Sequence, residues 1–140
     1  MNDYVIKYDE LSAYEYMELW NSVWDDAPSL EQVDLAMKNT LFRVSIFDKD
    51  RLIGMARVIG DKGLSYYIKD VVVIPEYQGK GIGRAIIDTL ENDIYFLRAR
   101  RIEIPASITG VPFYLKMGYH FKDGISEPDN EHIIRMEKNR

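Results

Sequence analysis

The sequence predicts an α+β fold in which a mixed, mainly antiparallel sheet is flanked by helices. Short runs rich in β-branched and aromatic residues alternate with segments whose apolar residues recur at helical spacing. The strand-like runs at 41–47 and 52–59 are joined by a tight turn, as in an antiparallel hairpin. A helical segment separates the strands expected at 66–74 and 101–104, so a crossover can connect this pair.

Two capping boxes mark the helices that follow the first strand, which is expected at 4–8. Ser12 and Glu15 have the spacing at which each side chain can bond the backbone N–H of the other at a helix start. Ser29 and Gln32 have the same spacing, and apolar residues follow both pairs at helical intervals. We therefore expect two consecutive helices before the hairpin.

A longer helix and several short elements are expected in the C-terminal half. Pro75 ends the strand at 66–74, because proline cannot donate to a strand ladder. The long helix should carry its apolar residues on one side, at Ile82, Ile86, Ile87, Leu90, Ile94 and Leu97. A strand, a helix and two closing strands should follow, at 101–104, 111–116, 119–121 and 133–136.

Length and composition exclude several classes of protein. The 140 residues fit a single domain, residues 1–140, with one hydrophobic core. The chain has no Cys, which excludes thiol nucleophiles, thiolate metal sites and disulfides. A net charge of −5 argues against nucleic-acid binding, since phosphate backbones need clustered Lys and Arg. No apolar run approaches the ~18 residues of a membrane span, and the first residues lack a signal-peptide pattern. We expect a soluble, cytoplasmic protein that binds neither nucleic acid nor a membrane.

The most informative segment is a glycine-rich loop between a strand and a helix. The apolar run at 71–74 leads to Gly79, Gly81 and Gly83, where the long helix begins. Glycines allow successive backbone N–H groups to turn toward one point, and a helix start adds unpaired donors with a partial positive charge. The loop is therefore predicted to bind an anion, most naturally a phosphate or diphosphate. The alternative is a turn with a purely structural role.

Neither of two common nucleotide-binding motifs fits this loop. A P-loop would need Gly at position 74 and Ser or Thr at position 81, where the chain has Ile and Gly. A dinucleotide fingerprint fails because its third Gly is absent. Glu103 does lie ~20 residues beyond Gly83, where a ribose-binding acid would lie, so dinucleotide binding stays open.

Residues 78–83, Gln-Gly-Lys-Gly-Ile-Gly, resemble the Gln/Arg-x-x-Gly-x-Gly/Ala signature of the GNAT superfamily of acetyl-CoA-dependent N-acetyltransferases. The resemblance extends upstream through residues 70–75. It extends downstream to residues 112–119, which are similar to the Phe-Tyr-x-Lys-x-Gly-Phe/Tyr segment of that family. It implies a single GNAT-like domain that uses acetyl-CoA as co-substrate and no metal, and it suggests a homodimer.

The resemblance also implies which residues bind acetyl-CoA. The fourth strand of the family splays from the fifth, and its exposed backbone holds the pantetheine arm and the acetyl carbonyl, which implies this role for Val71, Val72 and Val73. The loop amides that would bind the coenzyme A diphosphate belong to Gln78, Gly79, Lys80, Gly81, Ile82, Gly83 and Arg84. The chain departs from the pattern at Ser107, where many members carry an Asn that touches the coenzyme, and at Gly110, which replaces a usual Ala.

Direct attack of an amine on the thioester needs no Ser or Cys nucleophile, but the attacking amine must be neutral. Asp70 is the first candidate base, because this lone carboxylate interrupts the apolar run before the cofactor strand. A hydrogen bond to a neighbouring turn or helix end is the alternative for Asp70, and Glu103 is the second candidate base. Tyr114 matches the catalytic tyrosine of the family, which protonates the leaving thiolate. The alternative for Tyr114 is core packing beside Phe113.

The sequence leaves the acceptor open. We expect a small-molecule amine, and the acidic balance of the chain favours a cationic one. A non-catalytic module that senses acyl-CoA or a nucleotide through the same loop is the alternative function. His120 and His132 have no neighbouring ligand cluster in the sequence, so no metal site is expected.

Overall fold

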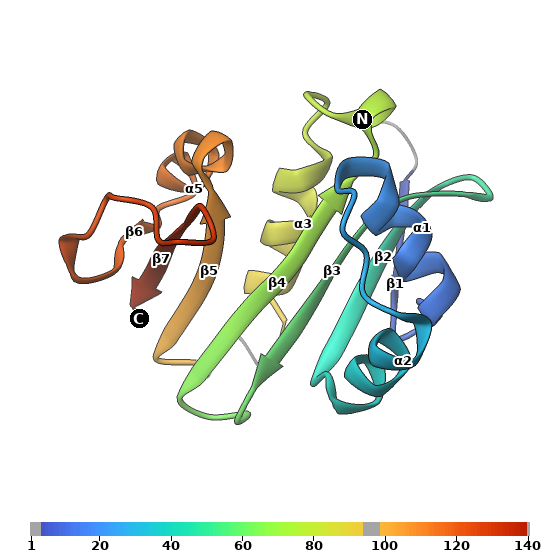
Figure 1. Cartoon of the computed structure of the whole chain (residues 1–140), viewed down its shortest axis with the longest axis horizontal. Coiled ribbons are helices and arrows are strands. Elements are labelled where there is room, and N and C mark those ends of the chain that lie inside the picture. The colour runs from blue at the N-terminus through green and yellow to red at the C-terminus, as the bar shows by residue number, and fades with distance from the viewer. Residues whose placement is uncertain (1–3, 94–98, 140) are drawn as a thin grey trace.

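The computed structural model describes residues 4–93 and 99–139, and in these ranges it places seven strands in one sheet (Figure 1). The strands are β1 (Tyr4–Tyr8), β2 (Phe42–Asp48), β3 (Arg51–Gly60), β4 (Ser65–Val73), β5 (Arg101–Ser107), β6 (His120–Phe121) and β7 (Ile133–Asn139). The α-helices are α1 (Ala13–Val23), α2 (Leu30–Asn39), α3 (Ile82–Glu91) and α5 (Val111–Lys116). Short 3-10 helices lie at η1 (Pro75–Tyr77), η2 (Ile108–Gly110) and η3 (Lys122–Gly124).

The strand order is β1-β2-β3-β4-β5-β7-β6. Every neighbouring pair in this order is antiparallel except β4 and β5, which are parallel. Because α3 connects these two strands, the pair is formed by the crossover that the sequence predicts. The predicted α+β class, with a mixed and mainly antiparallel sheet, is confirmed.

The parallel pair is joined at one end only. β4 pairs with β5 at Ser65, Tyr66 and Tyr67, and beyond Tyr67 the two strands separate (Figure 1). The other side of β4 stays paired with β3 as far as Val73. Beyond Tyr67, no described strand covers the edge of β4 that faces β5. Its backbone donors and acceptors on that edge can therefore bind a ligand.

Helices cover both faces of the sheet, with α1 and α2 on one face and α3 on the other (Figure 1). Both predicted capping boxes are present, since Ser12 accepts from the N–H of Glu15 and Ser29 accepts from the N–H of Gln32. The residues of α3 that face the sheet are almost fully buried: Ile82, Ile86, Ile87 and Leu90. No helix in the described ranges is long and apolar enough to cross a membrane.

Several element boundaries differ from the predicted ones. α3 is described as far as Glu91, and Ile94 and Leu97 of the predicted helix lie outside the described residues. β5 continues to Ser107 rather than ending at 104, because β7 pairs with it over its whole length. A strand of this kind gains stability from a distant partner, which its own short apolar run does not indicate.

Gly54 in β3 lies at a position where the sheet has no room for a side chain. A Cβ there would lie 2.8 Å from Cγ2 of Ile46 and 3.0 Å from the carbonyl oxygen of Val72. The second contact is with backbone, so the neighbouring strand would have to shift.

We expect Gly54→Ala to lower the free energy of unfolding by ~1–3 kcal/mol, because overpacking strains the strands on both sides. Urea unfolding followed by circular dichroism measures this change. Gly63→Ala is the matched control, because the nearest atom to its new Cβ would be Oδ1 of Asp61 at 4.0 Å. Equal midpoints for the two variants would contradict the expectation.

Candidate active site

The glycine loop has the backbone conformation of an anion cradle. Gly79 and Gly81 have φ of +76° and +83°, a region that L side chains rarely adopt. Gly81 is the N-cap of α3 and contributes no side-chain cap, and the first helical bond runs from the N–H of Ala85 to the carbonyl of Gly81. The N–H groups of the first turn of α3 therefore have no helical acceptor and point out of its N-terminus.

Side chains anchor this loop to the sheet. Nε2 of Gln78 donates to the carbonyl oxygen of Val73 at 2.9 Å, so this side chain fixes the loop to the end of β4. The hydroxyl of Tyr77 donates to Oδ2 of Asp48 at 2.6 Å, and Nζ of Lys80 lies 5.1 Å from the centre of the Tyr77 ring. The loop is thus tied to β4 and to the β2–β3 hairpin, with a cation beside the cradle.

The unpaired edge of β4 lies directly before this loop in the chain and includes Val71, Val72 and Val73. Val72 is buried, whereas Val71 and Val73 are half-buried. The side chains therefore stabilise the core, and the backbone of the same three residues borders the gap between β4 and β5. Packing and ligand binding are compatible functions for this segment, because they use different groups of each residue.

A β-bulge at Asp70 interrupts β4 just before this segment. Met55 pairs with Val72 and Arg57 pairs with Lys69, so Ala56 alone faces two residues of β4. Asp70 has a φ of +55°, which is uncommon for a residue other than glycine. The bulge turns its side chain toward α1 and β3.

The Asp70 carboxylate accepts hydrogen bonds from both of these elements. Nε of Arg57 donates to Oδ2 of Asp70 at 2.6 Å, and the Tyr16 hydroxyl of α1 donates to the same oxygen. Burial, followed by the charge and hydrogen bond of Asp70, raises the pKa of Tyr16 well above its usual value. The proton therefore stays on Tyr16, and Asp70 acts as the acceptor that joins α1, β3 and β4.

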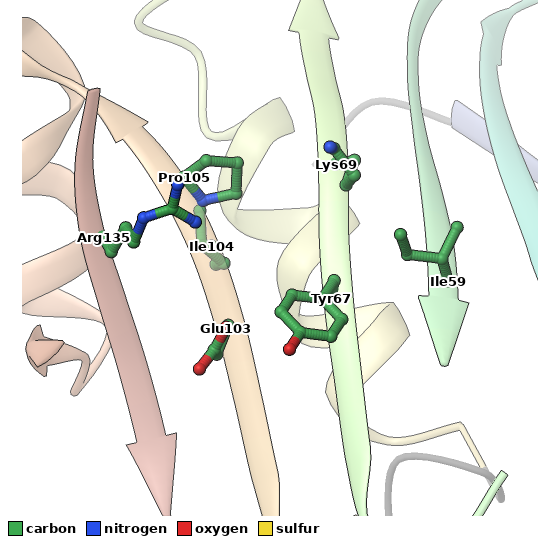
Figure 2. Close-up of a pocket in the computed structure, with 7 residues that line it drawn as sticks. All are labelled: Ile59, Tyr67, Lys69, Glu103, Ile104, Pro105 and Arg135. Carbon is green, nitrogen blue, oxygen red and sulfur yellow. The ribbon is translucent and has the colours of Figure 1, made fainter. Parts of the chain in front are cut away.

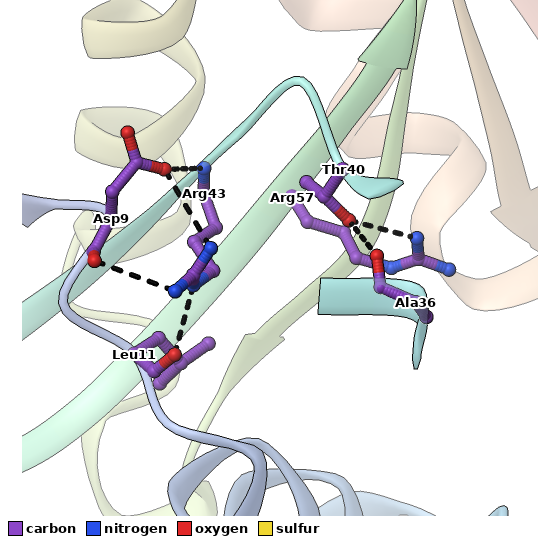
Figure 3. A network of polar contacts seen from close by, with 6 residues as sticks. All are labelled: Asp9, Leu11, Ala36, Thr40, Arg43 and Arg57. Carbon is purple, nitrogen blue, oxygen red and sulfur yellow. Dashed lines mark hydrogen bonds and ion pairs between the residues drawn. The ribbon is translucent and has the colours of Figure 1, made fainter. Parts of the chain in front are cut away.

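Arg57 extends this network to α2. Its Nη1 lies 3.4 Å from Oγ1 of Thr40, whose hydroxyl donates to the carbonyl oxygen of Ala36 in the last turn of α2 (Figure 3). A second cluster nearby holds the chain before α1 against β2, and it consists of Asp9, Leu11 and Arg43 (Figure 3). Both helices on this face are thus fixed by arginines of the sheet.

A pocket of about 210 Å³ lies where β4 and β5 begin to separate. Lys69 is directly opposite Arg57 in the β3–β4 ladder, and Arg57 reaches Thr40 at the end of α2, so the pocket opens on the face that carries α1 and α2. Figure 2 shows the residues that line it, which are Ile59, Tyr67, Lys69, Glu103, Ile104, Pro105 and Arg135.

The Glu103 side chain in this pocket is only 6% exposed and forms an ion pair with Lys122 at 2.5 Å. Glu103 pairs across the sheet with Tyr67 of β4 on one side and with Glu137 of β7 on the other. Oε1 of Glu137 lies 3.5 Å from Nε2 of His120 and its Oε2 lies 3.7 Å from Nε of Arg101. Two buried carboxylates on neighbouring strands are therefore each compensated by a cation at the protein surface.

Tyr114 of α5 lies on the other side of the gap from β4. Its side chain is 8% exposed, and its ring packs edge-on against Phe113 and Tyr119 at centroid distances of 5.1 and 6.0 Å. Burial raises the pKa of Tyr114 to about 12, so its hydroxyl is protonated at neutral pH and can donate a hydrogen bond. Phe113 lies 3.7 Å from where a Cβ at Gly83 would be, which places α5 beside the start of α3.

Residues 9–140 match the family described as the acetyltransferase (GNAT) domain. This chain belongs to the GNAT family. An uncharacterized N-acetyltransferase, ycf52 of Pyropia yezoensis, is 32% identical over 131 residues, which cover 90% of this chain and 72% of that protein. The crystal structure of SA2161 from Staphylococcus aureus, described as a probable acetyltransferase, is similar with a TM-score of 0.77 and 30% identity, over 91% of this chain and 94% of that one.

Another similar structure was solved with coenzyme A bound. It is the paia N-acetyltransferase of Thermoplasma acidophilum, which has a TM-score of 0.67 and 16% identity to this chain. The match covers 97% of this chain and 99% of that one, and it shows a common fold. In the GNAT chain described here, no group of three or more His, Cys, Asp or Glu side chains within residues 4–93 and 99–139 could hold a metal ion.

The two departures from the GNAT sequence pattern are structurally coupled. Oγ of Ser107 accepts from the N–H of Gly110 at 3.1 Å and caps the 3-10 helix η2, which leads into α5. A Cβ at position 110 would lie 3.2 Å from this oxygen. Glycine at 110 therefore leaves room for the serine cap.

The structure brings the predicted GNAT site residues to one gap, with the loop residues 78–84 and Val71–Val73 on the β4 side and Tyr114 across from them. Asp70 directly precedes Val71, and its side chain accepts hydrogen bonds from Tyr16 of α1 and from Arg57 of β3. The sequence did not indicate four residues that the structure places at the Asp70 bulge or in the pocket, which are Tyr16, Arg57, Lys69 and Arg135. A charged residue inside a strand was the only local signal for Lys69, and Tyr16 is one of the apolar residues at helical spacing that follow the capping box of α1.

Proposed function

We propose that this GNAT protein is an acetyl-CoA-dependent N-acetyltransferase that acetylates a small-molecule amine by direct attack. The observation that carries the proposal is the combination of the glycine cradle at 79–84 with the uncovered edge of β4 immediately before it. The glycine cradle can bind an anion. The uncovered edge of β4 can offer backbone hydrogen bonds to the amides of an extended ligand. The coenzyme A complex of the Thermoplasma protein, which shares the fold, supports the same assignment.

Acetyl-CoA would supply the activated acetyl group. We assign its diphosphate to the N–H groups from Gly79 to Arg84, with Lys80 as the neighbouring cation. Its pantetheine amides and acetyl carbonyl would bond to the backbone of residues 71–73. The pocket beside Lys69 and Glu103 opens on the face of the sheet that carries α1 and α2, whereas α3 lies on the other face. This pocket would hold the acceptor amine.

In the reaction, the amine nitrogen forms a bond to the acetyl carbon, and the bond from that carbon to sulfur breaks. The nitrogen loses a proton, and the coenzyme thiolate gains one. A lysine-like amine at pH 7 costs ~4.6 kcal/mol to deprotonate, so a base or a desolvating pocket can contribute much of the acceleration.

Glu103 is the carboxylate best placed to receive this proton, directly or through water. It lines the acceptor pocket, and its second oxygen is not used in the ion pair with Lys122. Asp70 was the first candidate from the sequence and stays a prediction as the base. Its bonds to Arg57 and Tyr16 support a positioning function, because both partners bond to the same carboxylate oxygen, Oδ2.

We assign Tyr114 as the hydrogen-bond donor to the departing sulfur. With a pKa of about 12, complete proton transfer to a thiolate of pKa ~8.5 would be uphill by ~5 kcal/mol in the free protein. A hydrogen bond that stabilises the developing charge does not carry this cost. The proton that the sulfur finally takes can then come from solvent. The homodimer and the cytoplasmic location stay predictions from the sequence.

We expect Gly81→Ala to raise the Kd for acetyl-CoA about tenfold, since a non-glycine residue in the left-handed region costs ~1–2 kcal/mol and the loop N–H groups must shift. Isothermal titration calorimetry measures the affinity. Gly124→Ala is the matched control, because Gly124 has a φ of +72° and is equally unobstructed but lies in η3. A wild-type protein that fails to bind acetyl-CoA, or binds NAD instead, would refute the proposed function.

We expect Glu103→Gln to lower kcat/KM most below pH 8 and to recover at high pH, where the amine loses its proton unaided. Asp70→Asn should lower kcat/KM equally at all pH values and also lower the free energy of unfolding, because Arg57 loses its buried charge partner. Rate measurements from pH 6 to 10 separate the two roles. If kcat/KM of Asp70→Asn recovered at high pH and that of Glu103→Gln were lowered equally at all pH values, Asp70 would be the base.

We expect Tyr114→Phe to lower kcat at least tenfold while the Kd for acetyl-CoA stays within a few-fold, because only the donor is removed. Tyr119→Phe is the control, since Tyr119 is buried against Tyr114 and its hydroxyl donates to Glu91 at 2.8 Å, away from the gap. That variant should lose stability and keep its kcat. An unchanged kcat in Tyr114→Phe, measured where chemistry is rate-limiting, would return Tyr114 to a packing role.

A further inference from the structure

The acceptor pocket has two cations that form no close ion pair, although Arg135 interacts with Asp129 at longer range. Within the described part of the chain, no carboxylate lies within 4.0 Å of Lys69 or Arg135. Other cations near this gap are paired, as in the ion pairs Arg57–Asp70, Lys122–Glu103, Arg101–Glu137 and Lys138–Glu91. In a chain with a net charge of −5, unpaired cations that line one pocket need an explanation.

The two cations lie on both sides of the same strand position. Arg135 of β7 is the direct partner of Pro105 in β5. On the other side, Tyr67 of β4 pairs with Glu103 of β5. Because the two strands are parallel, the residues two positions further along, Lys69 and Pro105, face each other across the gap. Figure 2 shows the guanidinium of Arg135 beside Pro105 and the side chain of Lys69 on β4 across the gap, with the oxygens of Glu103 and Tyr67 toward the other end of the pocket.

The charges of this pocket therefore differ along its length. The end nearer to Val71 has two cations with no carboxylate within 4.0 Å, of which Arg135 interacts with Asp129 only at longer range. The far end has the Glu103 carboxylate, which is paired with Lys122. A polycationic acceptor would place its charge against Lys69 and Arg135 without compensation. An acceptor with an anionic group would pair with both, and the planar guanidinium of Arg135 can bind two oxygens at once.

We propose that the acceptor of this enzyme is an amine that also carries an oxyanion, a carboxylate or a phosphate, bound between Lys69 and Arg135. This inference rests on the proposed acetyl transfer and specifies its substrate class. Since Lys69 is two residues before Val71, the anion would lie about one strand repeat, ~7 Å, from the backbone assigned to the acetyl group. That separation suits a small amino acid or aminoalkyl phosphate, and the pocket volume of about 210 Å³ suits the same size.

The same two cations would also help the chemistry. A positive charge near the acceptor nitrogen disfavours its ammonium form relative to its neutral form, and only the neutral amine attacks. The anion of the substrate would fix the amine in place, while Glu103 accepts the proton. The locally positive pocket thus selects against the cationic amines that the overall acidity of the chain favours.

The test compares matched acceptors with the intact protein and acetyl-CoA. Amino acids are measured against their α-carboxamides, and O-phosphoethanolamine is measured against ethanolamine, so the two arms separate a carboxylate from a phosphate. We expect kcat/KM for the anionic member of at least one pair to be tenfold or more above that of its neutral counterpart. An equal or reversed preference in both arms, with the neutral amines acetylated, overturns this inference and leaves acetyl transfer intact.

Variants connect the preference to the two residues. Lys69→Gln and Arg135→Gln should each raise KM for the anionic acceptor at least tenfold, leave the neutral one within twofold and leave the Kd for acetyl-CoA unchanged. Arg135→Lys should restore part of the loss. Lys7→Gln on β1, which removes one positive charge at the far edge of the sheet, is the control and should change neither value.

Binding provides a readout that does not depend on turnover. In the presence of coenzyme A, the anionic acceptors should raise the melting temperature of the wild type but not of Arg135→Gln. Variants that weaken acetyl-CoA rather than the acceptor would overturn the inference, because the cations would then belong to the coenzyme. Failure of the wild type to bind acetyl-CoA would instead overturn the proposed function.

Discussion

The early end of the β4–β5 pairing is the constraint on which the rest of the structure depends. A parallel pair that continued past Tyr67 would close the gap and remove both the open edge of β4 and the pocket. Two features of the chain prevent this. The bulge at Asp70 changes the direction of β4, and Pro105 has no N–H to donate, which a strand tolerates where one edge is unpaired. Each of the two strands therefore has a residue that interrupts regular pairing near the point where they separate, which is Asp70 in β4 and Pro105 in β5.

Asp70 makes this interruption stable. Its left-handed backbone has a conformational cost of ~1–2 kcal/mol, which is comparable to the gain from one or two hydrogen bonds to a charged group. Arg57 and Tyr16 supply those bonds, and both are held away from solvent. Because Arg57 also reaches the end of α2, the shape of β4 is coupled to the position of the helices that flank the pocket. One hydrogen-bond network thus connects the bulge beside the gap to α1 and α2.

Local sequence signals predicted whatever depends on local interactions. The capping boxes at Ser12 and Ser29 and the glycine loop were recognisable because their partners lie within a few residues. The bond from Tyr16 to Asp70 joins residues 54 positions apart, and no local pattern indicates it. Lys69 and Arg135 meet at one pocket only because β7 inserts beside β5 in the sheet order, which neither residue determines. Tertiary arrangement brought together the parts of the site that local spacing could not show.

The contrast between the net charge of the chain and the local charge of the two proposed binding regions has a simple physical basis. Charges in water are screened over ~8–10 Å at physiological ionic strength, so the potential at a site reflects its nearest groups rather than the total of −5. Near the glycine loop, the nearest groups are backbone N–H donors and Lys80. In the pocket they are Lys69, Arg135 and Glu103, and Glu103 is paired with Lys122. The surface carboxylates are engaged in many places by their own cations, as in the exposed pairs of Asp34 with Lys38 and of Glu76 with Arg51. An acidic protein can therefore hold two locally positive regions, and the groups around each region, rather than the overall composition, determine which ligand can bind there.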